Sequence, residues 1–330
     1  MDSRLKNSCE SFIRNRDVLR DNFKYEGMVM HMMGAAVMTA SGGEVGVKEL
    51  IKCEDYIDSR AGVLSSLRGV FKMPMVINMA MSKNPEKYFD TVQKVFDEIK
   101  EERMSKDERL FLAAMIIASA TNDREKISEM VEVTGKIFDN TEASSRFFAD
   151  MSCYFTAASV VSGGVRDADA FKEEFENCKE ELEAQSGIGI IPEDLCMLMA
   201  AMPEDTEEKC ERAKAISEAL ADKRIRLGSG DAASMLASLT ALNMSPEEIA
   251  TAVADADAFL KDQKGFGLMG IGRSGRHLYA ALLTCIAYSE GGERGHIVVK
   301  SAVADAMDSL YVMMINSTNM MHFVTISGGR

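Results

Sequence analysis

The chain has 330 residues, 46% of them hydrophobic, and a formal net charge of −14. An acidic balance argues against duplex nucleic acid as a partner, because affinity for DNA is built from Lys and Arg on phosphates. No apolar run approaches the roughly 20 residues that cross a bilayer, and the N-terminus has no apolar signal segment. We therefore expect a cytoplasmic protein without membrane contact. Its seven cysteines follow no close-set pattern, which predicts reduced thiols in apolar helices, as at Cys153, Cys196 and Cys285.

Seven stretches of small and apolar residues recur along the chain about every forty positions, each followed by an amphipathic segment. Each pair predicts an inner helix that is apolar nearly all round and an outer helix with one apolar stripe. Strand signals are nearly absent. The pattern predicts an all-α helical-repeat fold of αα-hairpins, either an open solenoid or one curled into a partial αα-toroid. The apolar cores are Met32–Met38, Val76–Met81, Leu112–Ala120, Cys153–Val160, Cys196–Met202, Met235–Leu242 and Tyr279–Tyr288.

Helix starts are marked by capping residues. Asn84-Pro85 offers an N-cap and a proline at the first helical position, Ser105–Glu108 is a capping-box pattern, and Ser245-Pro246-Glu247-Glu248 combines both signals. The segments after Asn84 and Ser245 predict amphipathic outer helices. Their expected apolar stripes are Tyr88, Val92, Val95, Phe96 and Ile99 in one, and Ile249, Val253, Ala256 and Leu260 in the other.

We divide the chain into an N-terminal helical lead-in (1–25), a single repeat domain (26–310) and a C-terminal tail (311–330). Pro85 and the residues after it match Pro246 and those after it at an offset of 161, and the next apolar stretch matches at 167. A six-residue insertion between Lys264 and His277 accounts for the difference. Tandem duplication, with halves 28–140 and 190–310, explains this match. Convergent drift among repeats is the alternative.

Negative charge is concentrated in the block Asp167–Asp222. It holds seventeen acidic and five basic residues, hence −12 of the total −14. Two solvated outer helix faces are the simplest explanation. A docking surface for a basic partner is the other.

A family resemblance is carried by three runs: SRAGVLSSLR (59–68), NPEK (84–87) and FLAAMII (111–117). Together they resemble the uncharacterised bacterial family called domain of unknown function 4003 (DUF4003), over about residues 20–310. The resemblance implies a cytoplasmic bacterial protein of mostly helical fold. It implies no activity and no functional residues.

The glycine-rich insertion satisfies the pattern G-x-G-x-x-G twice, at 265–270 and 270–275. A dinucleotide site is excluded because a helix precedes the pattern and no βαβ unit is found. A small anion could instead bind exposed backbone N–H groups and guanidinium groups where the segment opens the helix Leu278–Tyr288. A lengthened connection between helices is the competing interpretation. The candidate anion-binding residues are Gly270, Gly272, Arg273, Gly275, Arg276 and His277.

Many arginines fall where an outer helix leads into the next inner helix, so a regular solenoid would gather them on one rim. Arg favours bidentate recognition of carboxylate or phosphate, and pairing with carboxylates of adjacent units is the alternative to a ligand site. The rim candidates are Arg60, Arg68, Arg224 and Arg226, and Arg103, Arg109, Arg146, Arg273 and Arg276 share their placement.

The chain has 25 Met and no Trp, with Met-rich stretches beside His31 and His322. Core packing, an adaptable apolar groove and a Cu(I) site are three explanations, in order of preference. We predict no metal and no cofactor, and no complete catalytic motif is present, which leaves enzymatic activity open. The preferred function is a scaffold that binds a protein or peptide. The alternative is a small-anion binding protein or enzyme that uses residues 270–277.

Overall fold

The computed structural model describes residues 1–42, 45–60, 71–104, 107, 109–141, 152–185, 192–227, 234–267, 270–289 and 303. These residues form fourteen helices and no strand, which confirms the all-α prediction. No helix among them is both long and apolar enough to cross a membrane. Arg68, Arg146, His322 and the predicted tail 311–330 lie outside the described residues.

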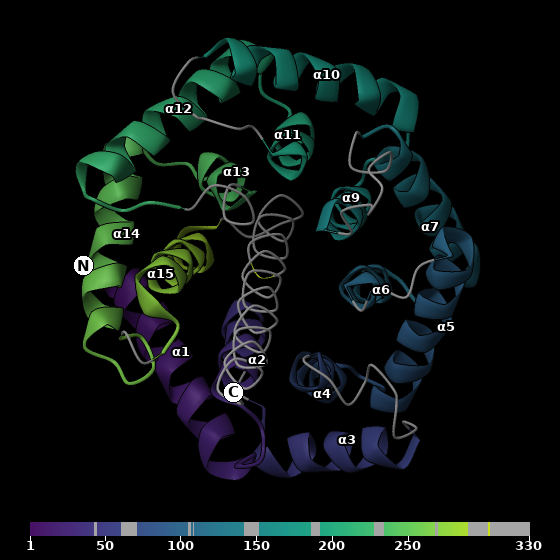
Figure 1. The fold of residues 1–330 in the computed structure, drawn as a ribbon. Helices are drawn as coiled ribbons and strands as arrows, with labels where there is room; N and C mark the ends of the chain where they lie inside the picture. Colours follow the sequence, from purple (N-terminus) through teal and green to yellow (C-terminus); the bar gives the residue numbers. More distant parts are fainter. Residues whose placement is uncertain are drawn as a thin grey trace, which may run out of the picture.

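The described helices form two layers around a common centre, and inner and outer helices alternate along the chain (Figure 1). The outer helices are α1 (Ser3–Asn22), α3 (Val47–Arg60), α5 (Pro85–Arg103), α7 (Arg124–Asp139), α10 (Ala168–Ala184), α12 (Thr206–Asp222) and α14 (Pro246–Lys261). The inner helices are α2 (Met28–Ala40), α4 (Lys72–Met81), α6 (Leu110–Ala120), α9 (Ser152–Ser162), α11 (Glu193–Ala200), α13 (Ser234–Thr240) and α15 (Gly272–Tyr288).

The inner helices bury most of their residues, because these residues are apolar nearly all round. In α6 every residue from Leu110 to Ala118 is buried, whereas α5 buries one stripe. That stripe contains Phe89 in place of the predicted Tyr88, whose side chain is only half-buried. The stripe predicted for α14 is buried in full. The prediction that inner helices are more buried than outer ones is confirmed for these pairs.

The predicted caps position the outer helices. The Asn84 side chain accepts from the backbone N–H of Lys87, and Pro85 begins α5. Ser245 and Glu248 form the predicted capping box at the start of α14. The third predicted cap, Ser105–Glu108, lies mostly outside the described residues. Each cap satisfies backbone N–H groups that the first turn of a helix leaves without a partner. It therefore fixes the residue at which the outer helix begins.

Helix α1, within the predicted lead-in 1–25, packs against α2 and also against α14 and α15. At this contact the ring of Phe12 lies 6.1 Å from Phe266 and 5.2 Å from Tyr279, between ring centroids. Arg16 Nη1 donates to the carbonyl of Lys264 (2.7 Å). The first and last described helix pairs therefore meet in an aromatic contact, which we call the seam.

All seven cysteines lie within the described residues and are buried, and none of them forms a disulfide. Burial raises the pKa of Cys196 to about 12. A raised pKa disfavours the thiolate, which is the nucleophilic form of this side chain. The cysteines therefore contribute to the core.

Candidate functional site

The glycine-rich segment proposed to bind an anion is more helical than predicted. Helix α15 begins at Gly272, six residues before the predicted start at Leu278. Gly275 is buried in its first turn, where a Cβ would come within 2.9 Å of Ile271 Cβ. The expectation that an anion would meet the first N–H groups of a helix Leu278–Tyr288 is thus wrong in its position, because Leu278 lies inside the helix.

The charged residues of this segment contact protein groups. Arg276 forms a bidentate ion pair with Asp257, at 2.6 Å (Nε–Oδ1) and 3.4 Å (Nη2–Oδ2). Arg273 Nη2 donates to the carbonyl of Arg224 (2.8 Å), and its Nε donates to His277 Nε2 (3.4 Å). His277 Nδ1 contacts the backbone of Arg226: it lies 3.2 Å from the backbone N–H, which donates to a deprotonated Nδ1, and 3.1 Å from the carbonyl oxygen, which accepts from a protonated one.

His277 is a buried positioning group in this arrangement. Its side chain is buried, and desolvation lowers its pKa below the ordinary value, against the opposing pull of the Arg226 backbone and Asp257. It holds the connection after α12 against the first turns of α15.

Among the rim candidates, the structure brings Arg224 and Arg226 to Arg273, and all three side chains are exposed. Arg60 stands apart, with its guanidinium 5.4 Å from the ring centroid of Tyr56. Arg103 pairs with Glu102 and Asp139, and Arg109 pairs with Asp107. Pairing with a carboxylate of an adjacent unit, the alternative drawn from the sequence, therefore holds for Arg103 with Asp139 and for Arg276 with Asp257, whereas Arg109 pairs within its own connection.

Metal chemistry has no support in the described part of the chain, where no group of three or more His, Cys, Asp or Glu side chains could hold an ion. His31, beside the N-terminal methionines, is buried and its Nε2 donates to the carbonyl of Phe23 (2.9 Å).

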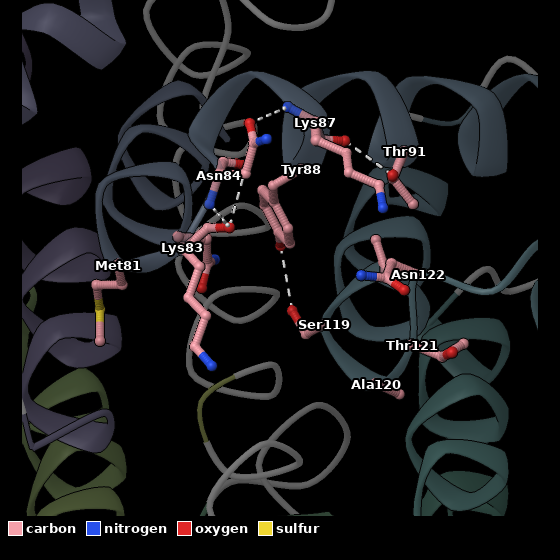
Figure 2. Close-up of a pocket in the computed structure, with 13 residues that line it drawn as sticks. Met81, Lys83, Asn84, Lys87, Tyr88, Thr91, Ser119, Ala120, Thr121 and Asn122 are labelled. Carbon is pink, nitrogen blue, oxygen red and sulfur yellow. Dashed lines mark hydrogen bonds between the residues drawn. The ribbon is translucent and has the colours of Figure 1, made fainter.

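A different part of the molecule contains a polar pocket, shown in Figure 2. It lies where α4 and α6 end and α5 begins, and its volume is about 560 Å³. The thirteen residues that line it include two lysines, three asparagines and five hydroxyl side chains, and none is acidic. We call it the α4–α5–α6 pocket. Its lining residues are Asn78, Met81, Ser82, Lys83, Asn84, Lys87, Tyr88, Thr91, Ala118, Ser119, Ala120, Thr121 and Asn122.

Tyr88 occupies the middle of this pocket. Its hydroxyl donates to the carbonyl of Met115 (3.3 Å) and lies 3.1 Å from Ser119 Oγ, which itself donates to Met115 O (2.7 Å). Burial raises the pKa of Tyr88 to about 12, so the phenol stays neutral at physiological pH. These bonds fix the end of α6 against the start of α5.

The two lysines lie on either side of Tyr88, and Lys87 extends toward Asn122 (Figure 2). Both are exposed, and neither pairs with a carboxylate of the described residues. The nearest acidic residue in sequence to Asn122 is Asp123, whose carboxylate accepts from the backbone N–H groups of Glu125 and Lys126 at the start of α7. The pocket thus presents two ammonium groups that have no carboxylate partner in the part of the chain that the structure describes.

Sequence reasoning missed this pocket because its residues come from three separate segments. Tyr88 was assigned to the apolar stripe of α5, and the lysines belong to no motif. One signal was available: Lys87 stands at the third position of a helix, where Glu is the residue that completes a capping box.

Comparisons with known proteins identify a family but no activity. A family model described as a protein of unknown function (DUF4003) matches residues 15–317. No curated protein and no solved structure matches the chain.

Proposed function

The chain belongs to the DUF4003 family, and we propose that it is a binding protein for a small polar anion, held in the α4–α5–α6 pocket. The observation that carries the proposal is the lining of this pocket: two lysines and no carboxylate, in a chain whose net charge is −14. A volume of about 560 Å³ falls within the range of small-molecule sites.

The position of the lysines supports the same conclusion. Lys83 precedes the N-cap of α5 and Lys87 follows it by three residues. Positive charge at a helix N-terminus is unfavourable, because the helix dipole already places partial positive charge there. Glu86 in the first turn offsets part of this. A bound anion would remove the conflict, and residues that oppose local stability are expected at functional sites.

The neutral groups of the pocket define the rest of the ligand. Asn78, Asn122 and Thr121 add amide and hydroxyl groups to the lining of the pocket. A compact molecule with a carboxylate or phosphate group and several hydroxyl or carbonyl oxygens matches this set, since charge-assisted bonds would hold the anion and neutral bonds the body.

The test is a thermal-shift panel of small carboxylates and phosphate esters, followed by calorimetric titration of any that stabilise the protein. Replacing Lys83 and Lys87 by Ala should abolish binding. The matched control is Lys94→Ala, an exposed lysine further along α5. Unchanged affinity in the double variant would reject the pocket as the site.

We propose as a second candidate that the chain is a scaffold for a basic protein or peptide. It is supported by α10 and α12, which pack side by side and carry exposed carboxylates such as Glu173, Glu180 and Glu211. Capture from the native cell with the wild type and with a variant in which these three are Lys would test it. Loss of a partner from the variant supports docking, and an identical capture profile favours a solvated face.

For the fold, we propose that the helix pairs are repeat units of a closed αα-toroid, in line with the contact of α1 with α14 and α15. If so, Phe12→Ala should destabilise the protein by roughly 3–5 kcal/mol, because it empties the seam. A small change in the unfolding midpoint would favour an open solenoid. The seven buried thiols support a reducing compartment, the cytoplasm.

A further inference from the structure

A second cavity, with a volume of about 390 Å³, lies at the seam. It is at the opposite end of the inner helices from the α4–α5–α6 pocket, where α2 begins and the connection from α14 arrives. We call it the seam cavity. Its lining residues are Arg16, Arg20, Lys24, Glu26, Met28, His31 and Lys264.

Four of these residues are cations, and they come from segments far apart in sequence. The buried Arg16 donates to Asp17 Oδ1 (2.7 Å) and to Lys264 O (2.7 Å), and Arg20 shares Asp17 (2.8 Å). Lys24 and Lys264 are exposed, and neither has a carboxylate partner among the described residues. The cavity therefore keeps two ammonium groups free while its arginines are held in place.

The one acidic lining residue, Glu26, lies 3.6 Å from Lys72 Nζ. Lys72 also pairs with Glu54 and Asp58, so the carboxylate of Glu26 belongs to an ion-pair network between the start of α4 and its neighbours. When Glu26 is counted together with Asp17 and Asp21, which pair with the two arginines, the four cations still leave the seam cavity with an excess of one positive charge.

The wall of the cavity is mostly carbon. Met28 and the alkyl stems of the long basic side chains supply it, and His31 presents a ring whose Nε2 is already bonded to Phe23 O. Gly265, in a left-handed conformation (φ +94°), brings the connection so close to α2 that a Cβ would come within 2.9 Å of Met28 Sδ. A purely hydrophilic ligand would leave this carbon surface uncovered.

We propose that the seam cavity binds an organic anion with an apolar body, a medium-chain carboxylate or phosphate monoester. The head group would lie between Lys24 and Lys264, and the chain would cover Met28. This site is separate from the proposed function, because it shares no residue with the α4–α5–α6 pocket.

A ligand in the seam cavity would stabilise the folded protein. Lys24 follows α1, and Lys264 follows α14, so one head group would bridge the first and last described helix pairs. A ligand that binds only the folded state raises its stability in proportion to the logarithm of its concentration. Binding should therefore appear as a rise in the thermal midpoint.

The test titrates the full chain with octanoate by calorimetry and thermal shift. Octanol supplies the body without the charge, and inorganic phosphate supplies the charge without the body. We expect binding of octanoate, weaker binding of both comparators by about tenfold or more, and a similar loss in the double variant Lys24→Ala, Lys264→Ala. Lys261→Ala, an exposed lysine at the end of α14, should bind like the wild type.

A second variant, Met28→Glu, keeps the lysines and places a carboxylate at the cavity wall, and it should also weaken octanoate. The proposal is overturned if octanoate does not bind, if the double variant binds it as tightly as the wild type, or if octanol or phosphate binds equally well. Octyl phosphate in place of octanoate then distinguishes a phosphate monoester from a carboxylate as the preferred head group. The Lys83→Ala, Lys87→Ala variant should retain octanoate binding, which separates this site from the first pocket.

Discussion

Two corners of the molecule share one construction and differ in chemistry. In the first corner α4, α5 and α6 follow one another, and in the second α13, α14 and α15 do. Both outer helices begin with an N-cap followed by proline, Asn84-Pro85 and Ser245-Pro246. Three positions after the cap, however, the first corner has Lys87 and the second has Glu248.

The residue three positions after the N-cap determines which hydrogen bonds each helix start can form. The carboxylate of Glu248 accepts hydrogen bonds from the backbone N–H and the hydroxyl of Ser245, both at 2.8 Å. Its hydrogen bonds therefore stabilise the start of its own helix, α14. Lys87 makes no such bond, and its ammonium group remains available to the pocket. Under the proposed function, the first corner has given up a local stabilising contact in exchange for a ligand-binding group.

Two further positions near the caps also differ between the corners, with a polar residue in the first corner and an apolar one in the second. Lys83 and Tyr88 of the first corner correspond, at the offset of 161, to Met244 and Ile249 of the second. Ile249 is fully buried, whereas Tyr88 is half-buried with its hydroxyl in the pocket. The second corner uses these positions for packing alone.

The largest expected effect is on ligand affinity, when the two lysines of the first corner are replaced by the residues at the matching positions of the second. Lys83→Met with Lys87→Glu removes two charge-assisted contacts, each contributing roughly 1.5–3 kcal/mol. Affinity for the ligand identified by the panel should fall by about 100-fold or more. Calorimetric titration measures it, with Met244→Lys as the control at the other corner. Retained affinity would show that the difference between the corners has no bearing on binding.

The next effect concerns packing, which we expect to be alike in the two corners. Ala114 in α6 and Ala280 in α15 are fully buried. Replacing either by Leu should destabilise by roughly 1–3 kcal/mol, because a close-packed row cannot accept the added volume. Chemical denaturation gives both values. A loss at only one of the two would mean that the corners differ in packing as well as in charge.

The sequence predicted the frame of both corners well. Five of the seven predicted apolar cores lie within inner helices, and the other two, Cys196–Met202 and Met235–Leu242, run two residues past the ends of α11 and α13. The caps at Asn84 and Ser245 begin the expected outer helices. Burial and capping depend on short, local sequence patterns, which is why they could be predicted. The start of α15 was placed six residues late, since glycine has low helix propensity. Gly275 is nevertheless buried in the first turn of α15, where a Cβ would come within 2.9 Å of Ile271 Cβ.

The site was harder to predict than the frame. Arg276 was a candidate for binding an anion, but its guanidinium pairs with Asp257 from the preceding helix, a partner nineteen residues away that spacing alone does not single out. Conversely, the α4–α5–α6 pocket is lined by Asn78, Lys87 and Asn122, which come from the ends of three different helices. The proximity of such residues depends on tertiary structure.

A smaller effect, of opposite sign in the two corners, should appear in the ligand-free protein. Lys87→Glu places negative charge near the start of α5 and should stabilise by roughly 0.3–1 kcal/mol. Glu248→Lys should destabilise by at least as much, since it also removes the capping box. Lys94→Glu, in the middle of α5, is the control for charge alone. If Lys87→Glu is neutral or destabilising, the lysine does not oppose the stability of its helix.

The smallest effect should come from His277, which gives the second corner its polar chemistry at the start of α15. Desolvation lowers the pKa of His277 below its ordinary value of 6.5. The unfolded chain therefore takes up a proton first, so this contribution to stability is complete above about pH 6.5 and is lost as the pH falls from there through the lower pKa of the folded state. His277→Asn retains a hydrogen-bonding group and removes the titration. Its denaturation free energy should fall less than that of the wild type between about pH 7.5 and about pH 5.5. Parallel curves for the two proteins would mean that His277 does not titrate differently in the folded and unfolded chains, and that its contact with Arg226 tolerates the charged imidazolium.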